Sequence, residues 1–285
     1  MDLSFIGEFA EKNNITLFSY AVQTEDGIFE YVSGKGNPLN DSYSVTKAFA
    51  ATAVGMLFDE GKIDVDEKAL DILEKENIRP ADKNWEKVTV RHALRHTMGI
   101  GQGYLDVDVE DIHTYGTDDF LKVLFDRSLV YEPGTCEVYS DAAYYLVSRI
   151  VEARAGERLD EYLMRKLLYP MKVREAAFSR CPRNHTIGAT GLFIRSSDMV
   201  KLGYLYANDG VWEGKRLLSS EWVKKEKENG FAFRPAGQEG IFGKGGMCGQ
   251  MLLYSPEKKY AAAWHSYTPD GKAATLTQLT KEFMG

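Results

Sequence analysis

Ser44 and Lys47 lie three residues apart in the stretch Asp41–Phe49, DSYSVTKAF. A serine hydroxyl and a lysine amine can act together as a nucleophile and its base. On a helix, residues i and i+3 share a face about 5–6 Å apart at Cβ, so the lysine can reach the serine hydroxyl. A serine becomes a nucleophile when a base takes its proton, and an amine does this in its neutral form, which burial and positive neighbours favour. The spacing predicts an activated nucleophile; the alternative is an ordinary serine at the start of a buried helix.

The segment after Ser44 favours the first interpretation. Apolar residues from Val45 to Leu57 cover nearly the whole circumference of a predicted helix that stops at Gly61, as in a helix buried in the middle of a structure. A lysine entering such a helix requires a reason, and the helix start offers backbone N–H groups that could hold an oxyanion. The chain contains the same spacing once more, at Ser255–Lys258, where Pro256 and the flanking strand patterns predict a turn.

The elements that must position these residues follow from periodicity and from Gly and Pro signals. Strands near both ends and helices between them predict an α/β (α+β) sandwich, in which one antiparallel sheet is built from the two termini. We expect a discontinuous α/β lobe, 1–63 with 186–285, and an inserted helical lobe, 64–185, with the active site between them. The expected helices are 2–13, the helix ending near 60, 67–74, 89–97, 117–126, 141–155, 157–168, 197–207, 219–228 and 270–283; the expected strands are 15–22, 27–32, 190–194, 246–254 and 259–267.

SVTK at 44–47, followed by DEGKIDVD at 59–66, resembles the serine β-lactamase and penicillin-binding protein superfamily. The resemblance is greatest to the group that joins class C β-lactamases, D-stereospecific peptidases and esterases. Further segments match this group in order along residues 15–285, and they are VTVRHALRHTMGI at 88–100, YEPGTCEVYSDAAYYLVSRIVEARAG at 131–156, TGLFIRSSDMVKLGYLYANDG at 190–210 and FGKGGMCGQMLLYSP at 242–256. The resemblance implies a β-lactamase/transpeptidase-like fold.

The resemblance also implies the roles of three catalytic residues. Ser44 would be the acylated nucleophile and Lys47 its proton acceptor, while Tyr139 would be the general base or the proton relay to the leaving group. A phenol has an ordinary pKa of about 10, and neighbouring lysines favour its charged form. Three such groups close together titrate as a unit, so no single microscopic assignment follows.

The third motif, Lys244-Gly245-Gly246, would bind substrate in the same resemblance. Lys244 would supply positive potential near Tyr139 and meet a substrate carboxylate. The backbone N–H groups of Ser44 and Met247 would form the oxyanion hole. Gly245 departs from the pattern because it lacks the hydroxyl that often helps to bind the carboxylate, which counts against efficient β-lactam hydrolysis.

The second motif, Tyr139-Ser140-Asp141, has an acid where the pattern has Asn. Asp141 cannot donate as an amide does, and its charge would hold Lys47 protonated, which weakens a mechanism with lysine as the base. A second register, Ser140-Asp141-Ala142 against Ser-Asp-Asn, is also open. No Glu-x-x-Leu-Asn follows Asp141, and Met98 replaces the small polar residue common in its loop.

Other candidate residues favour structural roles. His92 and His96 have a metal-compatible spacing, but without a Glu next to the first His or an evident third ligand. His265 is expected as a polar residue at the end of a strand, and Cys248 as a strand residue that packs inward or borders the cleft. The three cysteines include no CxxC pair and predict neither a disulfide framework nor a zinc site. We expect no metal and no cofactor.

Composition bounds the partners of the protein. The net charge of −7 and the absence of long Lys/Arg runs argue against nucleic acid and anionic membranes. The given chain shows neither a signal peptide nor a long apolar run, so a cytoplasmic location is expected. The predicted function is serine acyl transfer to water on a small ester, amide, D-amino-acid peptide or β-lactam, with esterase or peptidase favoured over a dedicated β-lactamase. The alternative is a non-catalytic ligand-binding module with the same cleft.

Overall fold

The computed structural model describes residues 1–34 and 39–284. They divide into two compact units. The first unit contains residues 1–48, 167–177 and 191–285, and the second contains 49–166 and 178–190. The sequence placed the lobe boundaries after residues 63 and 185. Helix α2, Thr46–Asp59, begins in the first unit and continues into the second.

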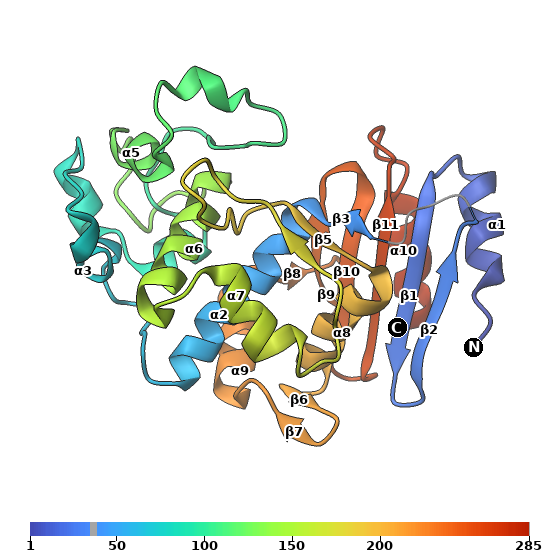
Figure 1. Ribbon diagram of the computed structural model, residues 1–285. Helices are drawn as coiled ribbons and strands as arrows, with labels where there is room; N and C mark the ends of the chain where they lie inside the picture. The colour runs from blue at the N-terminus through green and yellow to red at the C-terminus, as the bar shows by residue number, and fades with distance from the viewer. Residues whose placement is uncertain (35–38, 285) are drawn as a thin grey trace. The chain divides into compact units, whose positions relative to one another are not determined.

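A six-stranded antiparallel sheet dominates the first unit, in the order β2-β1-β11-β10-β9-β8. Strand β1, near the N-terminus, pairs directly with β11, near the C-terminus, which confirms the predicted sheet built from both ends of the chain (Figure 1). Its strands are β1 Leu17–Thr24, β2 Gly27–Val32, β8 Arg234–Pro235, β9 Phe242–Gly246, β10 Gln250–Ser255 and β11 Tyr260–Ser266. The short strands are β3 Asn40–Asp41, β4 Ala177–Phe178, β5 Leu192–Ile194, β6 Val211–Trp212 and β7 Lys215–Arg216.

Helices cover both faces of this sheet. On one face α1, Ser4–Lys12, and α10, Ala274–Met284, enclose an apolar cluster with large strand residues such as Tyr20 and Trp264, whose rings stack 5.5 Å apart. On the other face lies α8, Ser196–Ala207. Side chains alternate between faces along a strand, which sends small residues such as Ala261 toward α8. A Cβ on Gly203 of α8 would lie 3.2 Å from that of Ala261, so the helix packs close to the sheet.

The second unit is helical, and α6, Asp141–Ala155, is buried along most of its length. It contacts α3, α4 and α7. The helices of this unit are α3 Ala69–Ile72, α4 Val90–Leu94, α5 Phe120–Phe125, α6 and α7 Leu159–Leu163; α9, Ser220–Asn229, belongs to the first unit. Several of these helices are shorter than the segments that periodicity predicts, whereas α7 continues directly as a π-helical segment, Met164–Leu168, to the end of its predicted range.

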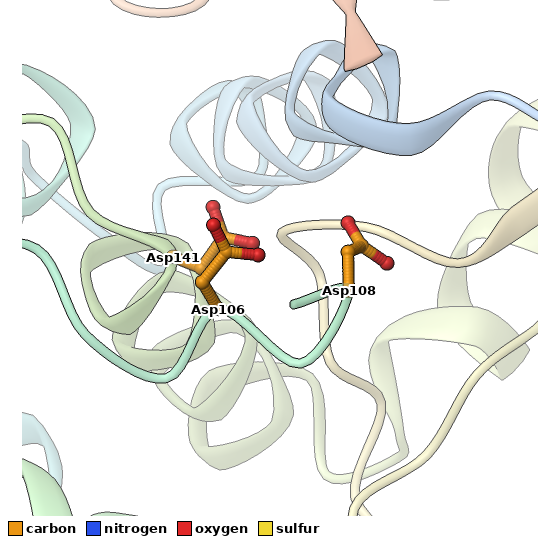
Figure 2. A group of neighbouring side chains, drawn as sticks. All are labelled: Asp106, Asp108 and Asp141. Atoms are coloured by element: carbon orange, nitrogen blue, oxygen red, sulfur yellow. The ribbon is translucent and has the colours of Figure 1, made fainter. Parts of the chain in front are cut away.

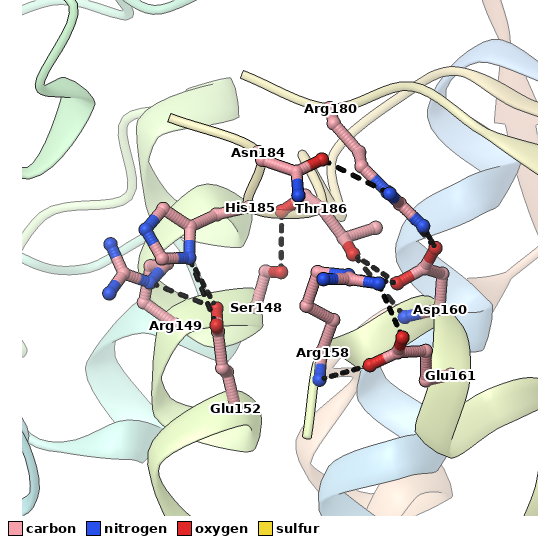
Figure 3. Close-up of polar contacts among 10 residues, drawn as sticks. All are labelled: Ser148, Arg149, Glu152, Arg158, Asp160, Glu161, Arg180, Asn184, His185 and Thr186. Carbon is pink, nitrogen blue, oxygen red and sulfur yellow. Dashed lines mark hydrogen bonds and ion pairs between the residues drawn. The ribbon is translucent and has the colours of Figure 1, made fainter. Parts of the chain in front are cut away.

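Polar contacts hold the returning segment 178–190 to the helices of the second unit (Figure 3). Ser148 of α6 donates its hydroxyl to the Thr186 carbonyl at 2.6 Å. The Thr186 hydroxyl donates to Asp160 of α7 at 2.9 Å, and Arg180 pairs with the same carboxylate at 2.5 Å. These bonds satisfy polar groups that would otherwise be buried without partners, so they fix the segment in place.

The prediction of one strand over 246–254 is wrong in its first part. Strand β9 ends at Gly246, and β10 begins at Gln250. Between them Cys248 has φ 58° and Gly249 has φ 90°, a left-handed conformation that no strand contains. Cys248 therefore lies in a tight turn and not in a strand.

Candidate active site

Ser44 and Lys47 meet at the start of α2. Ser44 lies half-buried in the 3₁₀ turn η1, Tyr43–Val45, directly ahead of the helix. Lys47 is 0% exposed, and its Nζ donates to Ser44 Oγ at 2.9 Å. The structure thus brings together the two residues that the spacing predicted, and it buries the lysine.

The backbone just before Ser44 is strained. Tyr43 has φ 44°, a left-handed conformation that costs a non-glycine residue about 1–2 kcal/mol. Its N–H donates to Asp41 Oδ1 at 2.8 Å, a local bond that supports the turn. Strain of this kind persists where surrounding contacts over-determine it, and it is common at functional sites.

Two buried hydroxyls tie the start of α2 to strand β5. Ser42 donates its hydroxyl to the Leu192 carbonyl at 2.8 Å, and the Leu192 N–H donates to Thr46 Oγ1 at 3.2 Å. The two hydroxyls lie 3.3 Å apart. In the sequence Thr46 is a polar residue in an otherwise apolar helix, and this exception is the available signal for the anchor.

Strand β9 brings the third motif to the same place. A Cβ on Gly246 would lie 2.5 Å from the Ser42 carbonyl oxygen, a distance that real side chains do not adopt. Glycine is therefore required for the end of β9 to lie against the segment that carries Ser44. Lys244 is half-buried on the same strand. The nearest atom to a Cβ on Gly245 would be at the flexible end of Met251, at 3.3 Å, with the Gln250 carbonyl oxygen in ordinary contact at 3.7 Å.

Tyr139 lies in the second unit, just before α6, and its side chain is 48% exposed. Its ring rests on the buried ring of His96, with centroids 4.4 Å apart and planes at 31°. The N–H of Ser140 donates to His96 Nδ1 at 3.3 Å, so this nitrogen accepts and a neutral ring carries its proton on Nε2. His96 supports Tyr139, a role that its sequence spacing with His92 did not suggest.

The residues around Tyr139 leave little freedom to the second motif. Ser140 caps α6 by accepting the Ala142 N–H at 3.2 Å, and it exchanges hydrogen bonds at 3.1 Å with both backbone groups of Tyr104. A Cβ on Gly103 would lie 2.6 Å from the Tyr139 carbonyl oxygen. The loop before Tyr104 thus depends on glycine where it passes the tyrosine.

Asp141, the acid that replaces Asn, is the first residue of α6 and is 5% exposed. A negative charge is favourable in the first turn of a helix. Its carboxylate groups with Asp106 and Asp108, and the three offer oxygens within 4.8 Å of one another (Figure 2). Thr190 donates to Asp108 at 2.7 Å. Three oxygens fall short of the six to eight that Ca²⁺ takes, and this is the one such group within residues 1–34 and 39–284.

His92 and His265 are parts of the framework. His92 Nδ1 accepts the Thr89 N–H at 3.2 Å in the N-terminal cap of α4, and burial lowers the pKa of the ring. His265 is fully buried in β11, with Nδ1 2.8 Å from the Ser196 hydroxyl, and burial lowers its pKa to about 3. A ring that stays neutral inside the sheet agrees with a structural role.

Comparisons with known proteins bear on this arrangement. The family model described as Beta-lactamase matches residues 36–282. The N-acetylmuramyl-L-alanine amidase of Bacillus subtilis (strain 168) is 30% identical over 151 residues, which cover 51% of this chain and 34% of that protein. Penicillin-binding protein 4 of Amycolatopsis lactamdurans is 26% identical over 212 residues, covering 63% of this chain and 54% of that protein. The matches thus span only about a third to a half of these relatives.

Solved structures agree on the fold. The octameric penicillin-binding protein homologue from Pyrococcus abyssi aligns with a TM-score of 0.76 at 21% identity, over 99% of this chain and 78% of that one. A penicillin binding protein from Bacillus halodurans aligns with a TM-score of 0.75 at 17% identity, over 97% and 98%. Within the described part of the chain, no helix combines the length and the apolar character needed to cross a bilayer.

Proposed function

The chain belongs to the beta-lactamase family, and from this premise we propose that it is a serine hydrolase that works through an acyl-enzyme on Ser44. One observation carries the proposal. The amine of a fully buried lysine, Lys47, lies 2.9 Å from the hydroxyl oxygen of Ser44, within the reach that proton transfer needs.

The proposed reaction has two steps. The Ser44 hydroxyl gives its proton to neutral Lys47, its oxygen bonds to the substrate carbonyl carbon, and the tetrahedral oxyanion expels an alcohol or amine that takes up a proton. Water then attacks the ester on Ser44, releases the carboxylic acid and restores the hydroxyl. In the structure the lysine donates to the serine, so catalysis requires the reverse direction of this hydrogen bond.

Further residues receive their proposed roles from the family pattern. The backbone N–H groups of Ser44 and Met247 would hold the oxyanion, and Lys244 would orient the substrate. Tyr139 would pass the proton to the leaving group. The backbone of Gly246 lies so close to the Ser42 carbonyl that no side chain fits between them. This close approach supports a fixed distance between the third motif and Ser44.

The substrate class we propose is a small ester, amide or D-amino-acid peptide. Relatives of the chain are named N-acetylmuramyl-L-alanine amidase and D-alanyl-D-alanine carboxypeptidase, which favours acyl transfer from amides. Gly245 offers no hydroxyl beside Lys244, and its flank is occupied by Met251, which disfavours strong binding of a β-lactam carboxylate. We therefore place a dedicated β-lactamase behind an esterase or peptidase.

A non-catalytic ligand-binding module is the second candidate. Asp141 favours it, because this residue is an acid where the family pattern has Asn and cannot donate a hydrogen bond as an amide does. Covalent labelling separates the two candidates. A hydrolase forms an adduct on Ser44 with a fluorophosphonate, detected by mass spectrometry, whereas a binding module holds ligand reversibly and gains no mass.

The experiment that tests the proposal measures hydrolysis of p-nitrophenyl acetate by wild type, Ser44→Ala and Ser255→Ala. Ser255 begins the second Ser-x-x-Lys of the chain and is the matched control. We expect turnover to fall by about 10⁴-fold or more in Ser44→Ala and to remain in Ser255→Ala. Equal turnover in wild type and Ser44→Ala would overturn the proposal.

A further inference from the structure

The turn between β9 and β10, residues 247–249, carries the proposed oxyanion donor and is strained. Cys248 and Gly249 are consecutive left-handed residues, with φ 58° and 90°. A Cβ on Gly249 would lie 2.6 Å from the Ser266 hydroxyl and 2.5 Å from Ala273 Cβ, so the turn is pressed against the end of β11. A conformation of this cost requires contacts that hold it.

Gln250 supplies the first of these contacts. Its side chain is 2% exposed, and Nε2 donates to the carbonyl oxygens of Met247, at 3.0 Å, and Ser266, at 2.6 Å. Its Oε1 accepts the Ser266 N–H at 3.0 Å. Two carbonyls face Nε2 and one N–H faces Oε1, so the chemistry of the partners determines the orientation of the amide.

The end of β11 supplies the second contact. The Ser266 hydroxyl donates to the Cys248 carbonyl at 2.8 Å, and the N–H of Thr268 donates to the same oxygen at 2.8 Å. Two carbonyls of the strained turn, those of Met247 and Cys248, therefore accept hydrogen bonds from the protein and are held in place.

We propose that Gln250 is a positioning residue for catalysis, which aims the Met247 N–H at the oxyanion by fixing the peptides of the turn. This inference rests on the proposed function. Gly246 is held on one side by its close approach to Ser42, and Met247 is held on the other side by Gln250. Since peptide units are planar, contacts on both sides limit the rotations ψ of Gly246 and φ of Met247, which orient the plane that carries the Met247 N–H.

Loss of the correct orientation of the Met247 N–H should weaken binding of the transition state more than binding of the substrate. An oxyanion donor acts on charge that develops during the reaction, so a misdirected N–H lowers kcat while leaving substrate binding nearly unchanged. A shift of about 1 Å in such a group costs up to about 10²-fold in rate. A residue that served only stability would change the amount of folded enzyme and not the rate of each folded molecule.

The test compares Gln250→Met with Gln23→Met, a matched change of a buried glutamine that pairs with Ala261 toward the opposite end of β11. Active sites are counted by exhaustive labelling with a fluorophosphonate, and kcat and KM for p-nitrophenyl acetate are expressed per labelled site. Phenylboronic acid, which forms a tetrahedral adduct with an active serine, reports transition-state complementarity.

We expect Gln250→Met to lower kcat by about 10–10²-fold, to weaken phenylboronic acid by a similar factor and to keep KM within about twofold. Gln23→Met should leave all three unchanged. The inference is overturned if Gln250→Met retains wild-type kcat and boronate affinity, or if both variants lose them alike.

Ser266→Ala is the second variant, and it decides the matter if Gln250→Met does not fold. It removes only the hydroxyl bond to the Cys248 carbonyl, so we expect a smaller fall in kcat, about 3–10-fold, with boronate affinity following it. Unchanged values would overturn the inference. Wild type without label on Ser44 would overturn the proposed function as well, whereas labelled wild type with unaffected variants overturns the inference alone.

Discussion

The chain contains Ser-x-x-Lys twice, and the two pairs have different surroundings. Ser44 lies at the entrance of a buried helix, and the amine of Lys47, which is 0% exposed, is 2.9 Å from its hydroxyl. Ser255 is the last residue of β10, and Lys258 is exposed in the turn before β11, as the sequence predicted. The spacing is identical, so the difference lies in what encloses the lysine.

Enclosure matters because water competes for both groups of the pair. An exposed ammonium is hydrated and mobile, and its interaction with a neighbouring hydroxyl is weak. A buried amine has lost this hydration, so it needs a protein partner and is held in one position. The comparison teaches that the motif supplies reach, whereas burial supplies position.

Lys47→Met should lower ester turnover, and the rate at which a fluorophosphonate labels Ser44, by about 10³-fold. The reason is the loss of the proposed proton acceptor. Lys258→Met, in the exposed pair, should leave both rates within about twofold, as is usual for a surface substitution. Equal losses in the two variants would break the comparison.

Tyr139→Phe should lower kcat by about 10²-fold, because the proposed proton relay loses its hydroxyl. Its melting temperature should stay at the wild-type value, since the ring that packs on His96 is retained. Tyr131→Phe is the control, with a tyrosine of similar exposure in the same region, 41% against 48%. Wild-type kcat in Tyr139→Phe would show that the Ser44–Lys47 pair needs no second base.

Gly246→Ala should lower turnover by about 10-fold and destabilise the protein by about 2 kcal/mol, because the new Cβ would collide with the Ser42 carbonyl. In Gly245→Ala the nearest contact is the flexible end of Met251, so this variant should cost less on both measures. Kinetics and urea unfolding of the two variants compare adjacent glycines of one strand. Equal effects would show that the approach of β9 to Ser42 does not matter.

Glu226→Gln asks whether burial alone makes a reactive group, and we expect no change in turnover. Glu226 is fully buried in α9, and burial raises its pKa to about 7, although the Ala232 and Phe233 N–H groups donate to it. If Glu226→Gln lost as much turnover as Lys47→Met, a buried titratable group would matter for turnover even without a nucleophile beside it.

The raised pKa of Glu226 also predicts that the stability of the protein depends on pH. The carboxyl keeps its proton up to about pH 7 in the folded protein and loses it near 4.5 in the unfolded chain. Between these values the unfolded chain binds fewer protons, so stability should fall as pH rises from 4.5 to 7, by about 3 kcal/mol. Urea unfolding of Glu226→Gln should show a flatter profile, and exposed Glu228→Gln should keep the wild-type slope.

Much of the fold could be predicted because local patterns and tertiary packing agree. The predicted turn at 24–27 joins β1 and β2, and α6 occupies the predicted range 141–155. The first part of the predicted strand over 246–254 failed because a glycine and a left-handed cysteine interrupt it, whereas β10 confirms the remainder. That turn has no periodicity to detect, and contacts with β11, distant in sequence, hold it.

The candidate site also contains residues that could be predicted from the sequence and residues that could not. Ser44, Lys47 and the glycines of the third motif could be identified from residue types, spacing and a family pattern. The supporting side chains could not: Gln250 is one polar residue at the start of an apolar strand, and His96 was only half of a histidine pair. Their importance comes from partners elsewhere in the chain, namely Ser266 for Gln250 and Tyr139 for His96.

The sequence by itself determined that a serine and a lysine could meet on one helical face, that the helix would be buried, and that both ends of the chain would form one sheet. These follow from local geometry and from the requirement that apolar surface be covered. Only the tertiary structure decided how closely the Lys47 amine approaches the Ser44 hydroxyl, why Gly246 has no side chain, and what holds the turn at Met247. The physical reason is that burial and close approach are properties of segments far apart in the chain, and no local pattern records them.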